Sequence, residues 1–347
     1  MWQELATLPD DLLSVEAHQL AARLGRPTLI HLSGRKPDPL FVSVLMHGNE
    51  TVGWEATKRL LGRYAGGREL PRALSLFIGN VSAAAQGVRR LEGQPDYNRV
   101  WPGCEPTGSQ EELMMRQVVE SMRARQPFAS VDVHNNTGIN PHYACVNKID
   151  PRFLHLANLF GRTVVYFVSP KGVQSMAMAR LCPAVTLECG KVGQAHGVEH
   201  ALEYLEACLH LTDHPSHPVA NQDIDLFHSV AQVKVPESIS FSFSAQTAAD
   251  ILFSSDLDHM NFRELPEGTA FGSVNGSRSI GLKVNDEAGR DVTERYFTIE
   301  DGQLCLQRSV MPSMLTINED VIRQDCLCYL MERYDSHLHD ADRSILR

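Results

Sequence analysis

The sequence predicts an α/β protein: an α/β/α sandwich around a mixed central sheet, followed by a smaller, mostly β C-terminal part. Two observations carry this prediction. Short apolar segments alternate with amphipathic segments over roughly the first 210 residues, a pattern typical of helices that cover a parallel or mixed sheet. Short alternating runs separated by Gly, Pro, Asn and Asp clusters then follow, which indicates a β-rich unit.

Local patterns predict the individual elements of the α/β part. Phe41–Met46 and Leu74–Val81 are nearly continuous apolar runs, typical of strands covered on both faces. In Thr51–Tyr64, apolar residues recur on one helical stripe. The other predicted strands are Thr28–Leu32, Phe128–His134, Thr163–Val168 and Ala184–Gly190, and the other predicted helices are Leu12–Leu24, Glu111–Arg125, Phe153–Phe160 and Gly197–Leu211.

A segment rich in Pro and His, Thr212–Asp223, separates the two patterns and resembles a linker. We therefore predict an α/β domain over residues 1–215, a β-rich domain over residues 216–335 and a tail over residues 336–347.

Composition and charge argue against several classes of protein. The net charge of −10 does not suit a binder of nucleic acid or of anionic membranes. No apolar run approaches the roughly 18 residues of a membrane span, and the N-terminal segment lacks the basic and apolar regions of a signal peptide. The eight scattered Cys are most simply reduced thiols. We expect a cytoplasmic protein that binds neither nucleic acid nor a membrane.

A histidine and a glutamate follow the predicted strand that ends at Met46, in the stretch "HGNE" (His47–Glu50). Residues three apart on a helical turn are neighbours, so an imidazole nitrogen and a carboxylate oxygen can reach one ion. Catalytic zinc sites usually combine three such protein ligands with an open position for water. The carboxyl end of a strand is also where open α/β sheets bind ligands. The alternative is that Glu50 only complements the helix dipole.

His134 is the best third ligand. "SVDVH" (Ser130–His134) alternates, so Asp132 and His134 share one strand face and the imidazole lies at the strand end. Asp132 is placed to accept a hydrogen bond from the second ring nitrogen and to orient the ring. The alternative is a structural histidine that is hydrogen-bonded at the end of the strand.

Glu188 is a carboxylate within the apolar segment "AVTLECG" (Ala184–Gly190). Such a group costs free energy unless it has a partner or a chemical role. Beside a metal-activated water it would act as general base and then as general acid towards a leaving amine. The alternative is an ion-pair residue.

Arginines gather in the loop "VRRLEGQPDYNRVWPG" (Val88–Gly103), where Arg89 and Arg90 are adjacent and Arg99 follows Asn98. A guanidinium group binds a carboxylate through two hydrogen bonds. The loop is therefore suited to holding a substrate carboxylate and polarising a scissile carbonyl. The alternative is a solvated basic loop.

The order of these motifs resembles that of zinc carboxypeptidase-like hydrolases of the M14 type. The short spacing between the ligands and the stretch "HGNE" are most similar to the pattern of the succinylglutamate desuccinylase/aspartoacylase branch. The motifs that carry the resemblance are His47-x-x-Glu50, Asp96-x-Asn98-Arg99, Asp132-x-His134-Asn135 and Leu187-Glu188-x-Gly190.

The resemblance implies a carboxypeptidase-like fold and one Zn²⁺ ion held by His47, Glu50 and His134. It implies that Glu188 is the acid/base that activates the water. Further roles implied are carboxylate binding by Asn98 and Arg99 and oxyanion stabilisation by Arg89 or Arg90, of which counting from Gln86 favours Arg89. Asn135 and Arg180 complete the predicted substrate-binding residues.

The chain departs from this family pattern at one informative position. Branch members usually carry another Arg about ten residues before the catalytic Glu, where it holds a second substrate carboxylate. Met178 stands there, and the nearest Arg is Arg180. This argues against a dicarboxylate substrate such as succinylglutamate or acetylaspartate. The segment after His134 is long and polar, which makes His142 and Tyr143 candidates for lining the pocket.

One further stretch, "HGVEH" (His196–His200), matches the pattern of inverted zinc proteases. That motif requires both histidines on a regular helix, whereas Gly193 and Gly197 indicate a helix start here. We therefore expect His200 on a helix surface.

These features predict a zinc-dependent hydrolase that cleaves an amide bond of a small N-acylated amino acid or related carboxylate-bearing molecule. A homo-oligomer is left open. One alternative is a zinc carboxypeptidase or cell-wall peptide amidase on the same scaffold, and another is a non-catalytic metal- or ligand-binding protein. A β-rich part that covers the site would favour small substrates, and one that stands clear would favour peptides.

Overall fold

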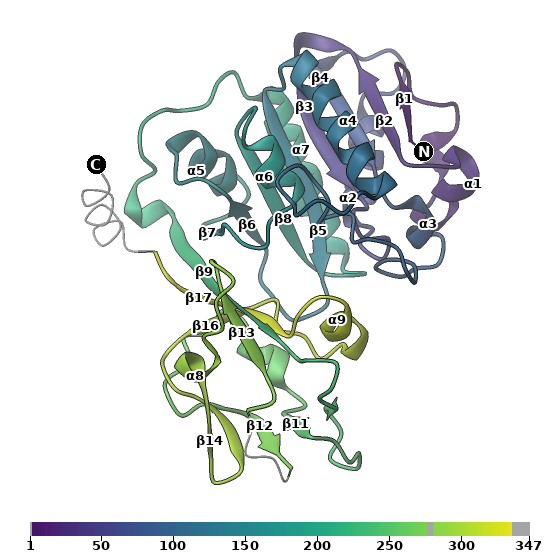
Figure 1. Ribbon diagram of the computed structural model, residues 1–347. Helices are drawn as coiled ribbons and strands as arrows, with labels where there is room; N and C mark the ends of the chain where they lie inside the picture. Colours follow the sequence, from purple (N-terminus) through teal and green to yellow (C-terminus); the bar gives the residue numbers. More distant parts are fainter. Residues whose placement is uncertain (1, 276–279, 335–347) are drawn as a thin grey trace.

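The computed structural model describes residues 2–275 and 280–334 (Figure 1). Within them, twelve strands form one sheet in the order β1-β2-β4-β3-β5-β8-β6-β7-β9-β17-β16, with β13 also paired to β9. The strands are β1 Gln3–Leu5, β2 Thr28–Leu32, β3 Gly34–Val44, β4 Leu70–Ile78, β5 Ala129–Asn136, β6 Tyr143–Val146, β7 Thr163–Tyr166, β8 Ala184–Lys191, β9 Asp225–Lys234, β13 Lys283–Asp286, β16 Met311–Ser313 and β17 Cys328–Arg333.

The centre of this sheet is parallel. β3 pairs in parallel with β4 and β5, and β5 pairs in parallel with β8. β2 and β6 run antiparallel to β4 and β8, so the predicted mixed α/β sheet is confirmed. Because β3, β5 and β8 point the same way, the residues that follow these three strands meet at one edge of the sheet.

Helices cover both faces of the main sheet, which gives the three layers of the predicted sandwich. Figure 1 shows α4 in front of the sheet and α7 behind it. α2 packs against α7. α5 is also in contact with α7, since the Tyr204 hydroxyl of α7 donates to the carbonyl of Leu156 in α5. The helices are α1 Leu20–Leu24, α2 Val52–Arg63, α3 Val81–Ala84, α4 Gln110–Arg125, α5 Pro151–Asn158, α6 Gln174–Met178, α7 Ala195–His210, α8 Thr293–Tyr296 and α9 Glu319–Gln324.

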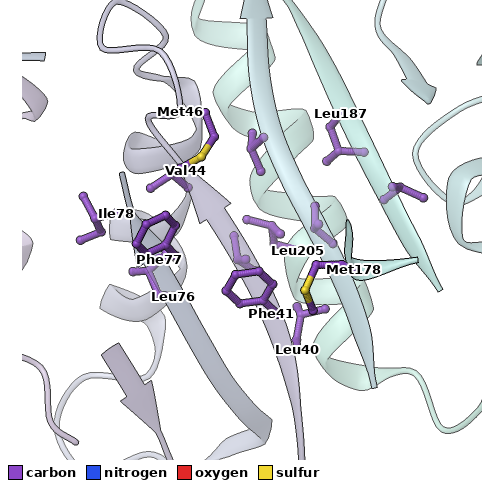
Figure 2. Packing of buried hydrophobic residues seen from close by; sticks show 14 of the residues in the cluster. Leu40, Phe41, Val44, Met46, Leu76, Phe77, Ile78, Met178, Leu187 and Leu205 are labelled. Carbon is purple, nitrogen blue, oxygen red and sulfur yellow. The ribbon is translucent and has the colours of Figure 1, made fainter. Parts of the chain in front are cut away.

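Apolar side chains on both faces of the central strands form the main core. Figure 2 shows residues of β3 and β4 packed beside Leu187 of β8 and Leu205 of α7. A glycine allows one of these helices to lie close to the sheet: a Cβ at Gly53 of α2 would lie 2.8 Å from a Val44 methyl and 3.0 Å from Val133. Burial of this apolar surface is the main stabilising contribution to the layer arrangement. Among the described residues, no helix combines the length and apolar character needed to cross a bilayer.

One local prediction was inaccurate, and one short helix was missed. The predicted helix Leu12–Leu24 is split into two 3-10 turns, Leu12–Ser14 and Ala17–Gln19, followed by the short α1. Apolar periodicity predicted a buried face in this segment but cannot tell a 3-10 turn from an α-helix, since both repeat near three residues. α9 was not predicted, although Asn318 caps its first turn by accepting from the Val321 amide.

The C-terminal part contributes to both sheets of the structure. A smaller second sheet has the order β10-β11-β12-β15-β14, and it shares an apolar cluster with β9, β13 and β17 of the main sheet. β9, however, pairs in parallel with β7, and β17 pairs with β9, so the main sheet continues past residue 215. The predicted domain boundaries stay a prediction, and the predicted tail lies outside the described residues. The strands of the second sheet are β10 Phe241–Ser242, β11 Ile251–Phe253, β12 Ala270–Val274, β14 Phe297–Glu300 and β15 Gln303–Leu306.

Candidate active site

Three buried side chains converge at the carboxyl edge of the main sheet. His47 and Glu50 lie in the turn between β3 and α2, and His134 lies near the end of β5. One ligand atom from each residue lies within 4.8 Å of the other two. Among the described residues, these three side chains form the cluster of His, Cys, Asp or Glu that could hold a metal ion. The predicted metal ligands are therefore brought together, whereas "HGVEH" does not form such a group within the same residues.

The backbone at the end of β3 places His47. Leu45 has a φ of 57°, a left-handed conformation that turns the chain out of the strand. Gly48 follows with its amide bonded to the Arg89 carbonyl at 3.0 Å. A Cβ at Gly48 would lie 2.2 Å from the Ala84 amide nitrogen, so only glycine allows this close approach of the two backbone segments.

Both imidazole rings present the same nitrogen to Glu50. The Nδ1 atom of His47 lies 2.8 Å from Glu50 Oε1, and the Nδ1 atom of His134 lies 2.7 Å from Glu50 Oε2. Burial alone would raise the pKa of Glu50, but the charges of His47 and His134 outweigh it and hold the pKa well below the ordinary value. The carboxylate is therefore ionised, as a metal ligand must be.

A second carboxylate orients each ring from behind. His134 Nε2 lies 2.7 Å from Asp132 Oδ2, which confirms the hydrogen bond predicted from the strand pattern. His47 Nε2 lies 3.0 Å from Asp96 Oδ1. With each Nε2 held by a carboxylate, Nδ1 is the nitrogen that would lose its proton and offer a lone pair when a metal ion binds. Sequence reasoning placed Asp96 in a motif but missed this role.

Glu188 lies beside the cluster on β8. It is the register partner of His134 on β5, its side chain is buried, and its Oε2 atom has no hydrogen-bond partner among the described residues. Burial raises the pKa of Glu188 to about 8, against a smaller opposing effect of the His134 charge. A carboxyl group that titrates near neutral pH is suited to accepting and releasing a proton.

Asn98 and the two predicted arginines approach the cluster from the 88–103 loop. Asn98 Nδ2 lies 3.2 Å from Asp132 Oδ2 and 3.1 Å from His134 Nε2. Arg89 Nη1 lies 3.3 Å from His47 Nδ1, and Arg89 Nη2 donates to Asp96 at 3.0 Å. Arg99 lines the same cavity.

The other predicted substrate-binding residues are placed differently. Asn135 lines the cavity, and its side chain accepts from the Val52 amide and donates to the Gly190 carbonyl. Arg90 donates to the Gln94 carbonyl at 2.8 Å. Neither Arg90 nor Arg180 lines the cavity, so a substrate role for these two stays a prediction that the geometry does not favour. Met178 is fully buried in the core.

Of the two residues proposed to line the pocket, one does so. Tyr143 lines the cavity with a buried hydroxyl that has no hydrogen-bond partner in the described part of the chain. His142 instead bonds to His200 through Nδ1 atoms 2.7 Å apart and stacks on His196. His200, which was predicted to lie on a helix surface, is a residue of α7 that is half-buried against this ring.

The C-terminal part supplies a wall of the cavity. Its lining residues are Ser229, Ser313, Met314, Val321, Asp325, Cys326 and Tyr329. Asp325 is bonded to both Arg89 and Arg99. The β-rich part therefore covers the site instead of standing clear of it. Sequence reasoning did not find these residues, because no local pattern links them to a loop that lies far earlier in the chain.

An α/β sandwich with two histidines and a glutamate at the carboxyl edge of its sheet, beside a buried carboxyl group, is typical of metal-dependent hydrolases of the carboxypeptidase-like class. The comparisons with known proteins refine this class. Residues 39–214 match the family described as "Succinylglutamate desuccinylase/Aspartoacylase catalytic domain". The chain belongs to this family, as its motifs predicted.

Individual relatives agree with the family assignment. Succinylglutamate desuccinylase from Pseudomonas aeruginosa is 37% identical over 92 residues, a match that spans 26% of this chain and 26% of that protein. The solved structure of succinylglutamate desuccinylase from Vibrio cholerae has a TM-score of 0.55 at 15% identity and covers 86% of this chain and 83% of its own. Murine aminoacylase 3 has a TM-score of 0.54 at 12% identity, covering 87% and 97%. At these identities the two structures show the shared fold.

Proposed function

We propose that this chain is a zinc-dependent hydrolase that cleaves the amide bond of a small N-acylated amino acid or a related carboxylate-bearing substrate. The family points to deacylase activity of the desuccinylase and aspartoacylase type. The observation that carries the proposal is the convergence of His47, Glu50 and His134 on one point beside the buried carboxyl group of Glu188.

The donor set fits zinc. Two imidazole nitrogens and one carboxylate are a common protein ligand set of catalytic zinc. Both Nδ1 atoms face Glu50, while both Nε2 atoms are held by carboxylates. This arrangement favours the tautomer in which Nε2 keeps its proton and Nδ1 would bind the metal. His47, Glu50 and His134 would hold the ion.

The remaining side chains supply the proton transfers and the charge stabilisation. A bound zinc ion would polarise the substrate carbonyl and lower the pKa of water at the site. Glu188 removes one proton from the attacking water as the water oxygen bonds to the carbonyl carbon. Arg89 donates to the carbonyl oxygen as that atom becomes negative. Glu188 then delivers the proton to the nitrogen, the C–N bond breaks, and a carboxylic acid and an amine are released.

The cover over the cavity favours small substrates over peptides. Met314, Val321 and Tyr329 of the C-terminal part line the cavity together with the 88–103 loop residues Asn98 and Arg99. A peptidase that acts on long chains needs an open cleft through which the chain can pass. A covered cavity suits an N-acylated amino acid, which buries most of its surface on binding.

Metal analysis combined with an activity screen tests the proposal. The purified protein is stripped with a chelator, reloaded with Zn²⁺ and assayed against N-acetyl and N-succinyl amino acids and short peptides. We expect about one zinc ion per chain and amine release from at least one N-acyl amino acid. Glu188→Gln should keep the zinc but lose activity by about 10²–10⁴-fold, the usual contribution of general acid–base catalysis.

Glu203→Gln provides the matched control, because Glu203 is an exposed residue of α7. It should retain both zinc and activity. A Glu188→Gln protein that binds zinc and turns over substrate at a near-normal rate would refute the role of Glu188. Zinc-loaded wild-type protein that cleaves only peptides would refute the substrate class.

A further inference from the structure

Asp325 forms ion pairs with Arg89 and Arg99, the two arginines that line the cavity. It directly follows α9, which Figure 1 shows close to the end of β5, between the two parts of the chain. Arg99 Nη2 donates to both Asp325 oxygens at 3.0 Å, and Arg89 Nη2 donates to Asp325 Oδ2 at 3.1 Å. A carboxylate from the C-terminal part thus occupies the guanidinium groups of the 88–103 loop.

These ion pairs use all the permanent positive charge of the described side chains that line the cavity. Among the described residues that line it, Arg89 and Arg99 are the ones with permanent positive charge. Arg89 is shared between Asp96 and Asp325, and Arg99 is paired with Asp325. A substrate carboxylate that enters this cavity finds no uncommitted cation among these lining side chains.

The pair formed by Arg99 and Asp325 is the more accessible of the two. The exposed fraction of the side chain is 26% for Arg99 and 14% for Asp325, against 10% for Arg89. Arg99 is also anchored to its own loop, because its Nη1 atom donates to the Asn98 carbonyl at 2.9 Å. A ligand can therefore reach this guanidinium group, whose position does not depend on Asp325 alone.

Two carboxylates cannot share the Nη2 atom of Arg99 at low cost. Both are negative, and each gains charge-assisted hydrogen bonds only if it lies within about 3 Å of the nitrogen. Like charges at that separation in a partly buried site repel strongly. Binding of a substrate carboxylate at Arg99 therefore requires Asp325 to move away.

We propose that Asp325 is a specificity residue that competes, as an internal carboxylate, with the carboxylate of the substrate for Arg99. This inference rests on the proposed function, together with the carboxylate-binding role that the family resemblance implies for Arg99. Asp325 weakens the binding of acids relative to the matching neutral amides, and its displacement couples substrate entry to the position of α9. The C-terminal part thereby sets the charge preference of a site whose candidate metal ligands and acid/base residue come from the N-terminal part.

Calorimetric titration of zinc-loaded protein with an acid and its neutral analogue tests this inference. The probes are N-acetyl-L-leucine and N-acetyl-L-leucinamide, and all variants carry Glu188→Gln so that binding is measured apart from turnover. Asp325→Asn should lower the ratio of the dissociation constants, acid to amide, about tenfold or more, because one charge-assisted pair no longer competes. An unchanged or higher ratio, or an acid that Asp325→Asn still fails to bind, would overturn the proposal.

Two further variants separate competition at Arg99 from other effects. Asp320→Asn removes the same charge from the exposed first turn of α9 and should leave the ratio within about twofold. Asp325→Ala should also favour the acid, and added formate should restore the wild-type ratio by filling the vacated place on Arg99. Formate without effect on an acid-selective Asp325→Ala would contradict direct competition.

The outcome is independent of catalysis, since no variant in the titration needs to turn over. If Asp325→Asn shifts the ratio of the dissociation constants but the wild-type protein hydrolyses no N-acyl amino acid, the proposed function is refuted and this inference stands. If the wild-type protein hydrolyses an N-acyl amino acid but the ratio is unchanged, this inference is refuted and the proposed function stands.

Discussion

Replacing Glu188 by Gln should stabilise the metal-free protein, by an amount that grows with pH. Burial raises the pKa of Glu188 from its ordinary 4.5 to about 8. Below pH 4.5 the carboxyl group is protonated in the folded and unfolded protein alike. Between pH 4.5 and 8 the unfolded chain releases this proton while the folded protein retains it. The free energy of unfolding therefore falls as pH rises through this window.

The size of the effect follows from the width of the window. Each pH unit in which only the folded protein keeps the proton is worth about 1.4 kcal/mol. The wild-type protein should therefore lose about 5 kcal/mol across the whole window through this one group. Gln is neutral at every pH and has nearly the same shape, so Glu188→Gln should lack this loss.

Urea unfolding of the chelator-treated proteins, followed by circular dichroism, measures the difference. At pH 5 the two proteins should agree within about 1 kcal/mol, and at pH 8.5 Glu188→Gln should be more stable by about 5 kcal/mol. Zinc should reduce the difference, because a nearby cation favours the ionised carboxylate. The exposed Glu203→Gln change serves as control. A difference that stays constant or shrinks with rising pH would refute the reasoning.

Two other substitutions test the ligand set and the turn that carries it. His134→Ala should reduce bound zinc from about one ion per chain to a small fraction, whereas His142→Ala should keep it because His142 lies outside the ligand group; equal metal content in elemental analysis of the two variants would contradict this assignment. Gly48→Ala should lower the free energy of unfolding by about 1–3 kcal/mol, since its Cβ would lie 2.2 Å from the Ala84 nitrogen. Gly62 lies in α2 with nothing within 4 Å of an added Cβ, so Gly62→Ala should raise the free energy of unfolding by about 0.5–1 kcal/mol in the same urea assay. If both substitutions changed the free energy of unfolding in the same direction, lack of space for a Cβ at Gly48 would not be the cause of the Gly48→Ala effect.

The parts of the site that sequence could predict are those set by strand direction. His47, Glu50, His134 and Glu188 each lie in or just after an apolar strand. Parallel strands bring such positions to one edge, so their meeting follows from alternation and chain order alone. The hydrogen bond between Asp132 and His134 followed in the same way from residues two apart on one strand.

The parts that sequence could not predict depend on long-range packing. Asp325 pairs with Arg99 across 226 positions of the chain, and no periodicity or spacing carries that information. The same holds for β9, whose alternating pattern predicted a strand but not its partner, β7. Arg180 was proposed for its nearness in sequence to a family position, yet it lies outside the cavity lining.

The pairing of β9 with β7 has a consequence for how the chain can be divided. A fragment that stops at residue 215 would lose β9 and leave the hydrogen-bonding groups of β7 exposed along one side. An uncovered apolar edge of this kind is a template for association with other chains. The same fragment would lack the wall that carries Val321 and Tyr329. Expression of the N-terminal part alone should therefore yield aggregated protein, and the cavity needs lining residues from both parts of the chain.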